Sequence, residues 1–443
     1  MKWQPLFAER TTQMRRSTVR ELLKVTAQPG MISFAGGIPA PELFPVPEVA
    51  QAAANVLQRR GEQALQYGET EGVAELRDWI AARFSRAHFQ VRPENVMIVT
   101  GSQQALDLIG KVFLNAGDRV LVENPTYLAM LSAWRPMMPA FVPLPSDTDG
   151  LCVDALSPLL RAGAKLIYLV PNFQNPQGIT LSLPRRRQLL ECINGRRLVP
   201  SDVAQTFLSA GSGDIPVPCS KLLATGKRAT TSHKPQTIII EDNPYGELRY
   251  SGDPLPHLLE LDAANGAGGE LETCVIHLGT FSKVLIPGLR VGWVIAPAEV
   301  IDKLVQAKQA ADLHTSTLCQ HVILELIRNG VLERQIPRLR EAYGLRRDTM
   351  LSALAAHFPD GTTWTRPDGG MFLLVTLPPH IEIGFLLKRA LARNVAFVPG
   401  DDFHLDGQGR NTLRLNFSNA TPERIEEGVK RLGGVLVEML RTG

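Results

Sequence analysis

Lys283 lies in a short segment of mostly small and apolar residues, TFSKVLIPGLRVGW, which spans residues 280–293. Apolar, strand-like runs precede and follow this segment, and a lysine enclosed by buried strands loses its hydration. Lost hydration lowers the pKa of the amine and makes it a nucleophile toward carbonyl groups. The hydroxyl groups of Thr280 and Ser282 and the guanidinium of Arg290 are suited to bind a phosphate dianion. These residue types predict a reactive amine beside an anion site.

An aldehyde that carries a phosphate would fit both halves of this arrangement, which favours pyridoxal 5'-phosphate bound through the lysine amine. The alternative interpretation is that Lys283 is a solvated lysine in a surface turn, which is the usual setting of a single lysine. The apolar runs CVIHLG and VGWVIA, together with the nearby hydroxyl groups and guanidinium, count against that alternative.

Polar side chains also follow two other apolar runs. Asp242 comes after the predicted strand 237–240, where a buried carboxylate needs a cationic partner. That partner is either a protonated pyridine nitrogen or a structural arginine. Asn175 follows the predicted strand KLIYLVPNF and precedes a proline, which favours an extended backbone. Because α/β sheets bind ligands at the carboxyl ends of their strands, both residues are candidates for one site.

The residues from Gly101 to Gln104 open a predicted helix that runs to Phe113. Exposed N–H groups at such a helix start bind anions, and Ser102 and Gln103 lie there. An ordinary N-cap by Ser102 is an alternative, and it is compatible with anion binding.

Two further residues are candidates for contact with a ligand. Arg414 alternates with leucines on a predicted strand, and it is either part of a salt bridge or a receptor for a carboxylate. Gly37 lies in a segment rich in glycine and proline, where the backbone can approach a ligand closely. A plain linker is the alternative for that segment.

The elements that must position these residues alternate between strands and helices over residues 46–297. This alternation predicts an α/β fold, in which a large domain has a mainly parallel sheet with helices on both faces. Residues 298–443 change to long helices followed by three strands, which predicts a smaller α+β domain. Residues 1–45 form an N-terminal arm in this division.

The composition argues against several classes of protein. The chain has 443 residues, of which 44% are hydrophobic and 21% charged, and its net charge of +3 indicates neither a nucleic-acid nor a membrane role. The five cysteines are dispersed and lack metal-ligand spacing, so we expect no metal site and a reducing, cytoplasmic setting. No signal peptide is predicted, and no apolar run reaches the roughly 18 residues of a spanning helix.

Several motifs follow one another in a characteristic order along nearly the whole chain. They are SFAGGIPAPELFP, QYG, TGSQQAL, NPTY, QNPQG, EDNPYGEL, TFSKVLIPGLRVGW, GGMF and LRLNFS. In these motifs the chain resembles the fold-type I, class I/II pyridoxal-phosphate aminotransferases, and most of all the 2-aminoadipate and kynurenine aminotransferase group. That group is also related to the catalytic part of MocR-type regulators.

The resemblance implies a reaction and a role for each residue. An L-amino acid of aminoadipate, aromatic or branched-chain type would exchange its amino group with a 2-oxo acid such as 2-oxoglutarate. Lys283 would hold the cofactor and move the proton of the substrate α-carbon, and Asp242 would pair with the pyridine nitrogen. Asn175 and Tyr245 would bond to the phenolic oxygen of the ring, and Tyr127 would stack on it.

The remaining roles concern the phosphate and the substrate. Tyr67 would reach the phosphate in the neighbouring subunit, which implies a homodimer with shared active sites. Arg414 would bind the substrate α-carboxylate, and Arg20 and Gly37 would contact the rest of the substrate. The residues implied to hold the phosphate are Ser102, Gln103, Thr280, Ser282 and Arg290.

Other activities on the same scaffold remain open at this point. A β-eliminating lyase or a decarboxylase would use the same lysine, aspartate and arginine. A MocR-like regulator would need a winged-helix domain, for which the residues before the catalytic part leave no room. We therefore expect an enzyme.

The segment 198–236 departs from the family pattern. It is rich in glycine, serine, threonine, proline and basic residues and lacks helical or strand periodicity. A loop of this length is uncommon inside a compact domain, so we interpret it as a mobile insertion at the edge of the sheet opposite the ligand. A partner-binding loop and a foreign sequence element are the alternatives.

Overall fold

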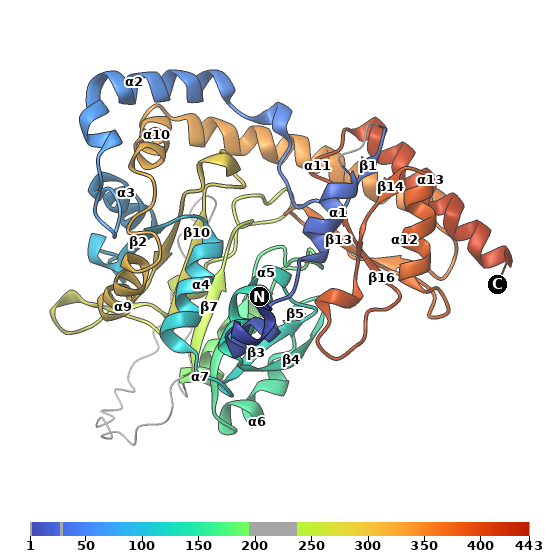
Figure 1. Ribbon diagram of the computed structural model, residues 1–443, viewed down its shortest axis with the longest axis horizontal. Coiled ribbons are helices and arrows are strands. Elements are labelled where there is room, and N and C mark those ends of the chain that lie inside the picture. The colour runs from blue at the N-terminus through green and yellow to red at the C-terminus, as the bar shows by residue number, and fades with distance from the viewer. Residues whose placement is uncertain (1, 27–29, 195–236, 443) are drawn as a thin grey trace, which may run out of the picture.

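The computed structural model describes residues 2–26, 30–194 and 237–442. Two principal sheets organise this part of the chain, and helices surround both (Figure 1). The sheets differ in strand direction, because the larger one is mainly parallel and the smaller one is antiparallel. The predicted insertion 198–236 lies outside the described residues.

The large sheet has the strand order β2-β11-β10-β7-β6-β3-β4-β5. Neighbouring strands from β10 to β4 run parallel, whereas β11 is antiparallel to β10 and β2, and β5 is antiparallel to β4. These strands are β2 (Val96–Val99), β3 (Arg119–Asn124), β4 (Ala140–Asp147), β5 (Gly150–Leu151), β6 (Ala164–Leu169), β7 (Ile238–Asp242), β10 (Val275–Thr280) and β11 (Gly292–Ile295).

Helices cover both faces of the large sheet. As a result, every residue of β2, β10 and β11 is buried. Helix α4 packs on β2, β10 and β11 through an apolar face, while α3 packs on β2 and α8 on β10. The predicted α/β fold is thereby confirmed. The helices up to this point are α1 (Thr18–Thr26), α2 (Val46–Leu65), α3 (Ala74–Phe84), α4 (Ser102–Phe113), α5 (Leu128–Trp134), α6 (Leu156–Arg161), α7 (Leu183–Asn194) and α8 (Leu258–Asp262).

The second sheet has the order β12-β13-β16-β15 and lies among the last helices. Helix α13 packs along α11 and against α12. The strands are β12 (Thr363–Trp364), β13 (Phe372–Thr376), β15 (Val398–Pro399) and β16 (Thr412–Asn416), and the helices are α9 (Ala298–Gln309), α10 (Thr317–Arg328), α11 (Val331–His357), α12 (Ile383–Ala392) and α13 (Pro422–Thr442).

Two small pairings complete the topology. Strand β1 (Ile32–Ser33) pairs in parallel with β14 (Val395–Ala396), so the N-terminal segment is joined to the C-terminal part of the chain. Strands β8 (Ala264–Asn265) and β9 (Leu271–Glu272) form a hairpin. Helices α9 and α10, which follow residue 298, pack on α4 and α2, which precede it. The division of the chain into domains at residue 298 stays a prediction.

Two element boundaries differ from the predictions. The run RVLVENPTY predicts a strand that ends at Tyr127, but β3 ends at Asn124 and Tyr127 is the N-cap of α5. Asp242 is the last residue of β7 rather than the second residue after it. No helix among the described residues is both long and apolar enough to cross a membrane.

Candidate active site

Lys283 lies just beyond the end of β10, after Phe281 and Ser282, at the carboxyl end of the parallel strands. Its Nζ donates a hydrogen bond to the carbonyl oxygen of Gly37, at 2.8 Å, so the glycine-rich N-terminal segment closes over the amine. Burial, together with the positive charges of Arg290 and Arg414, lowers the pKa of Lys283 to about 8. A substantial fraction of this amine is therefore neutral near physiological pH and able to act as a nucleophile.

Asp242 ends β7 at the same sheet edge, where β7 pairs with β10 and Asp242 faces Leu278. Its Oδ2 accepts a hydrogen bond from the hydroxyl of Tyr168, at 2.8 Å. Its Oδ1 is buried, and no group in the described part of the chain bonds to it. Burial raises the pKa of Asp242 to about 6. A buried carboxylate with one free oxygen fits a cationic ring nitrogen as its partner.

Glu241, the carboxylate next to Asp242, is not available to pair with a ring nitrogen. Successive side chains of a strand point to opposite faces, so Glu241 faces away from Asp242. Its two oxygens accept hydrogen bonds from the backbone amides of Leu258 and Leu259, at 2.7 and 3.1 Å. His277 lies 2.9 Å from it as well, so this carboxylate is satisfied by protein groups.

A group that we call the anion cup consists of Ser102, Thr280, Ser282 and Arg290. The Nη1 of Arg290 donates to Ser282 Oγ at 3.3 Å, and Thr280 Oγ1 lies 3.0 Å from the same oxygen. The Oγ of Ser102 is buried and has no partner among the described residues. A guanidinium, three hydroxyl groups and the positive end of α4 fit a phosphate dianion.

Gly101 allows the two halves of the anion cup to approach each other. Its φ of 74° is a left-handed conformation, and a Cβ at this position would lie 2.4 Å from Nη2 of Arg290. Gly101 is also the N-cap of α4, so Ser102 is the first helical residue and the N-cap that we considered for it is not formed. The side chain of Gln103 donates to the carbonyl of Ala129, at 3.2 Å, which leaves only its backbone amide at the helix start.

Arg414 lies on the second sheet and points toward the first. Its Nη1 donates to Asn175 Oδ1 at 2.9 Å, and its Nη2 donates to the carbonyl of Ala35 at 2.6 Å. Its Nε is buried without a partner among the described residues. The guanidinium carbon lies 4.3 and 5.3 Å from the ring centres of Phe372 and Phe403.

Burial lowers the pKa of Arg414 to about 10, so the side chain stays charged at neutral pH. Asn175 links it to Tyr245, because Asn175 Nδ2 lies 3.5 Å from the Tyr245 hydroxyl. A charged, buried arginine with an unpaired N–H fits an incoming carboxylate.

Tyr127 is electrostatically coupled to several of these groups. Burial and the charge of Asp242 raise the pKa of Tyr127 to about 12, and the charges of Arg414, Arg290 and Arg20 act in the opposite direction. The phenol therefore lies within electrostatic range of the carboxylate and of all three arginines. Arg20 itself is an exposed residue of α1.

Tyr67 is a predicted site residue whose side chain turns to the surface, as that of Arg20 does. It lies in the loop after α2, its side chain is 80% exposed, and its ring meets His314 edge-on at 5.8 Å. Two contributors to the site were missed by sequence reasoning. Tyr168 offered only a weak signal, a phenol within an apolar strand, and the carbonyl of Ala35 offered none.

A desolvated amine, a buried carboxylate with a free oxygen and an anion cup together define an enzyme site for pyridoxal phosphate. Residues 29–432 match the family model for aminotransferase class I and II, and the chain belongs to this family. It is a pyridoxal-phosphate-dependent aminotransferase of fold type I.

Named relatives agree over the full length of the chain. The 2-aminoadipate transaminase of Thermus thermophilus is 43% identical over 99% of this chain and 98% of its own length. Aromatic-amino-acid aminotransferase 1 of Thermococcus litoralis is 40% identical over 100% of this chain and 96% of its own. A crystal structure of the Thermus thermophilus α-aminoadipate aminotransferase, complexed with N-(5'-phosphopyridoxyl)-L-leucine, covers both chains fully with a TM-score of 0.84 and 41% identity.

Replacing Asp242 with asparagine is expected to stabilise the cofactor-free protein at pH 8. The folded-state pKa of Asp242 lies above its ordinary value, so its contribution to stability is present below pH 3.8 and is lost as the pH rises through about 6. The substitution should recover about 3 kcal/mol at pH 8 and about half of that at pH 5. Urea unfolding of both cofactor-free proteins at the two pH values measures this difference.

The exposed Asp302 on α9 provides the control, because Asp302→Asn should cause no such pH-dependent change. A cofactor-free Asp242→Asn protein that is no more stable than the wild type at pH 8 would contradict the assignment. In the presence of cofactor the same substitution should lower turnover, since the ring nitrogen loses its carboxylate.

Proposed function

We propose that this enzyme transfers the amino group of an L-amino acid with a long side chain, of aminoadipate, aromatic or branched-chain type, to 2-oxoglutarate. One observation carries the proposal. Arg414, the carboxylate receptor, is bonded through Asn175 to the sheet edge that holds Lys283 and Asp242. An amino acid held there by its carboxylate would present its α-carbon to the cofactor and the lysine.

When bound, pyridoxal phosphate supplies an aldehyde that takes up the amino group and a ring that withdraws electrons from the α-carbon. Lys283, whose lowered pKa leaves it partly neutral, would accept the proton of the α-carbon and pass it to the carbon of the cofactor's aldehyde group. Asp242 keeps the proton on the ring nitrogen by its negative charge. Arg414 holds the substrate carboxylate with its planar fork.

Other residues hold and enclose the reactants. The anion cup anchors the phosphate at the start of α4, and the backbone amide of Gln103 adds a donor there. Tyr127 would stack on the ring, while Asn175 and Tyr245 would bond to its phenolic oxygen. The carbonyl of Gly37 holds the Lys283 amine in place until the cofactor takes it up. The backbone of Gly37 would then face the substrate.

The relatives' names support the choice of substrates, since one acts on 2-aminoadipate and another on aromatic amino acids. We assign recognition of the distal side chain of the substrate to Arg20. This residue is exposed on α1, and its positive charge lowers the pKa of Tyr127. A guanidinium at that position would attract a second carboxylate and would lie over an aromatic ring.

A panel of amino donors with 2-oxoglutarate tests this function. We expect aminoadipate, aromatic and branched-chain donors to react, with glutamate as the product of the acceptor. The half-reaction in which 2-oxoglutarate returns the cofactor from its amine form distinguishes transamination from elimination or decarboxylation. Ammonia or carbon dioxide release without that half-reaction would contradict the proposal.

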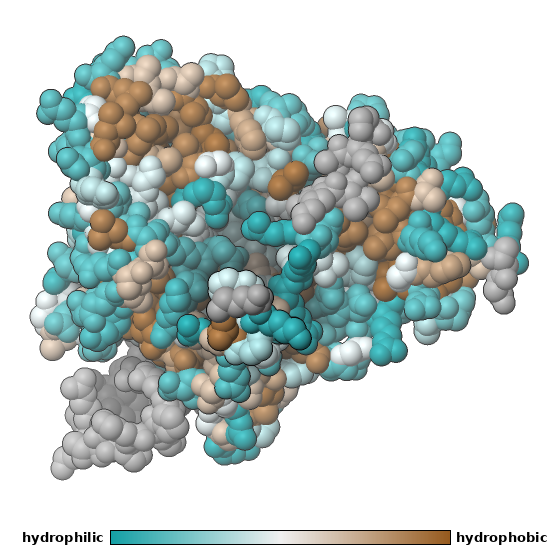
Figure 2. Space-filling model, viewed as in Figure 1, coloured by the Kyte–Doolittle hydropathy of each residue, from teal (hydrophilic) through white to brown (hydrophobic). Residues whose placement is uncertain are grey.

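We also propose a cytoplasmic homodimer in which Tyr67 completes the partner's phosphate site. Exposed apolar side chains gather on α2 and the loop after it, and include Val46, Leu57, Leu65 and Tyr67. Figure 2 shows an apolar surface over α2 and α10. Surfaces of this kind mark interfaces between subunits.

We also propose that the chain is divided into an arm (1–45), a large domain (46–297) and a small domain (298–443).

A further inference from the structure

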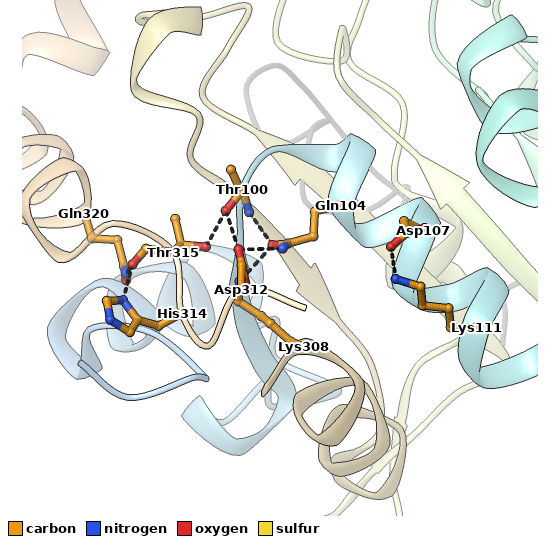
Figure 3. Close-up of polar contacts among 9 residues, drawn as sticks. All are labelled: Thr100, Gln104, Asp107, Lys111, Lys308, Asp312, His314, Thr315 and Gln320. Atoms are coloured by element: carbon orange, nitrogen blue, oxygen red, sulfur yellow. Dashed lines mark hydrogen bonds and ion pairs between the residues drawn. The ribbon is translucent and has the colours of Figure 1, made fainter. Parts of the chain in front are cut away.

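A buried lysine outside the active site lies close to the anion cup. The side chain of Lys308, in the last turn of α9, has no exposed surface. Its Nζ lies 2.7 Å from Asp312 Oδ1 and 2.8 Å from Gln104 Oε1 (Figure 3). Leu313, with a φ of 66°, makes the turn after the helix. A buried ammonium is unfavourable unless it is paired and hydrogen-bonded, so the ion pair calls for an explanation.

The ion pair fixes the side chain of Gln104, which extends from the first turn of α4. Gln104 Oε1 accepts from Lys308 and from the backbone amide of Thr100, at 2.8 Å each. Gln104 Nε2 donates to Asp312 Oδ2 at 2.6 Å. Because Lys308 can only donate and the carboxylate of Asp312 only accepts, the amide has a single orientation.

The same contacts fix the turn that leads into α4. The amide of Thr100 is held by Gln104, and its Oγ1 lies 3.1 Å from Asp312 Oδ2 and 3.1 Å from Thr315 Oγ1. Gly101 and Ser102 follow directly, so the backbone at the anion cup is anchored from the side of α9 (Figure 3). The unpartnered Oγ of Ser102 belongs to the anchored segment.

We propose that Lys308, Asp312 and Gln104 position the start of α4 for the cofactor phosphate, and so set the preference of the site for a phosphorylated ring. This inference rests on the proposed function of the anion cup. The charges of Lys308 and Asp312 cancel, so the three residues act through the orientation of the turn rather than through added positive charge. They are positioning residues, because none of them belongs to the anion cup.

Asp312→Ala distinguishes positioning from charge. The substitution leaves the cation of Lys308 near the anion cup, so simple attraction would strengthen phosphate binding, whereas loss of positioning would weaken it. We expect the dissociation constant of pyridoxal 5'-phosphate from the cofactor-free protein to rise about tenfold. The dissociation constant of pyridoxal, which lacks the phosphate, should stay within about twofold. Fluorescence titration with both compounds gives the ratio.

Two further variants make the test independent of folding. Lys308→Met combined with Asp312→Ala leaves no unpaired buried charge, so we expect it to keep the melting temperature of the cofactor-free protein and still lose the preference. Asp302→Ala removes an exposed carboxylate from the same helix and should change neither constant.

Specific outcomes would overturn the inference. Tighter binding of pyridoxal 5'-phosphate by Asp312→Ala, or equal losses for both compounds, would show that the three residues do not position the phosphate site. A wild-type protein that binds the two compounds equally would remove the phosphate role of the anion cup itself, and the inference with it.

Discussion

Lys283→Ala is expected to lose the visible absorbance of the bound cofactor and to reduce turnover by at least about 10⁴-fold. The amine performs two tasks, since it attaches the cofactor and moves the proton of the α-carbon. Its low pKa of about 8 and its bond to Gly37 show that the protein prepares it for both tasks. Absorbance spectra and multiple-turnover assays with an amino donor and 2-oxoglutarate measure the two losses.

Lys303→Ala provides the matched control, because Lys303 is an exposed lysine on α9. This variant should keep both the absorbance and the turnover of the wild type. A Lys283→Ala protein that continued to transaminate over many cycles would refute the assignment of the catalytic base.

Arg414→Ala is expected to lower kcat/KM by about 10²- to 10⁴-fold for every amino acid that the enzyme accepts. The variant loses two charge-assisted hydrogen bonds to the carboxylate, each worth about 1.5–3 kcal/mol. The reduction should be uniform, because all these substrates share the α-carboxylate and differ only in the side chain. Steady-state kinetics with an aromatic, a branched-chain and an acidic donor measure the effect.

Arg414→Lys keeps the charge but loses the planar fork, so it should recover only part of the activity. Arg393→Ala removes an exposed arginine and should leave kcat/KM unchanged. A loss in Arg414→Ala that was confined to acidic donors would mean that this arginine reads the side chain of the substrate instead.

The fold and the centre of the site could be predicted because strand ends are visible in the sequence. Apolar runs followed by polar residues mark the carboxyl ends of β7 and β10, and parallel strands bring such ends to one edge. Asp242 and Lys283 therefore belong to the same edge of the sheet. The exact ends of the strands were less certain, since Tyr127 looks like part of an apolar strand but begins α5.

Residues that support the site from distant parts of the chain could not be predicted. Tyr168 bonds to Asp242 across two neighbouring strands, and only the register of the sheet places the phenol against the carboxylate. Lys308 looks like any polar residue of an amphipathic helix, and its burial depends on how α9 packs against α4. Such contacts depend on tertiary packing, which the local pattern of residue types does not specify.

The two phenyl rings beside Arg414 have a consequence for what the enzyme rejects. Phe372 and Phe403 cover the guanidinium, and none of the residues that the structure describes accepts a hydrogen bond from its Nε–H. An amine without a carboxylate, such as a decarboxylated amino acid, would leave this cation buried and unpaired. Sites built around a buried polar partner discriminate strongly against ligands that lack it. Biogenic amines should therefore be excluded even where their side chains match those of good substrates.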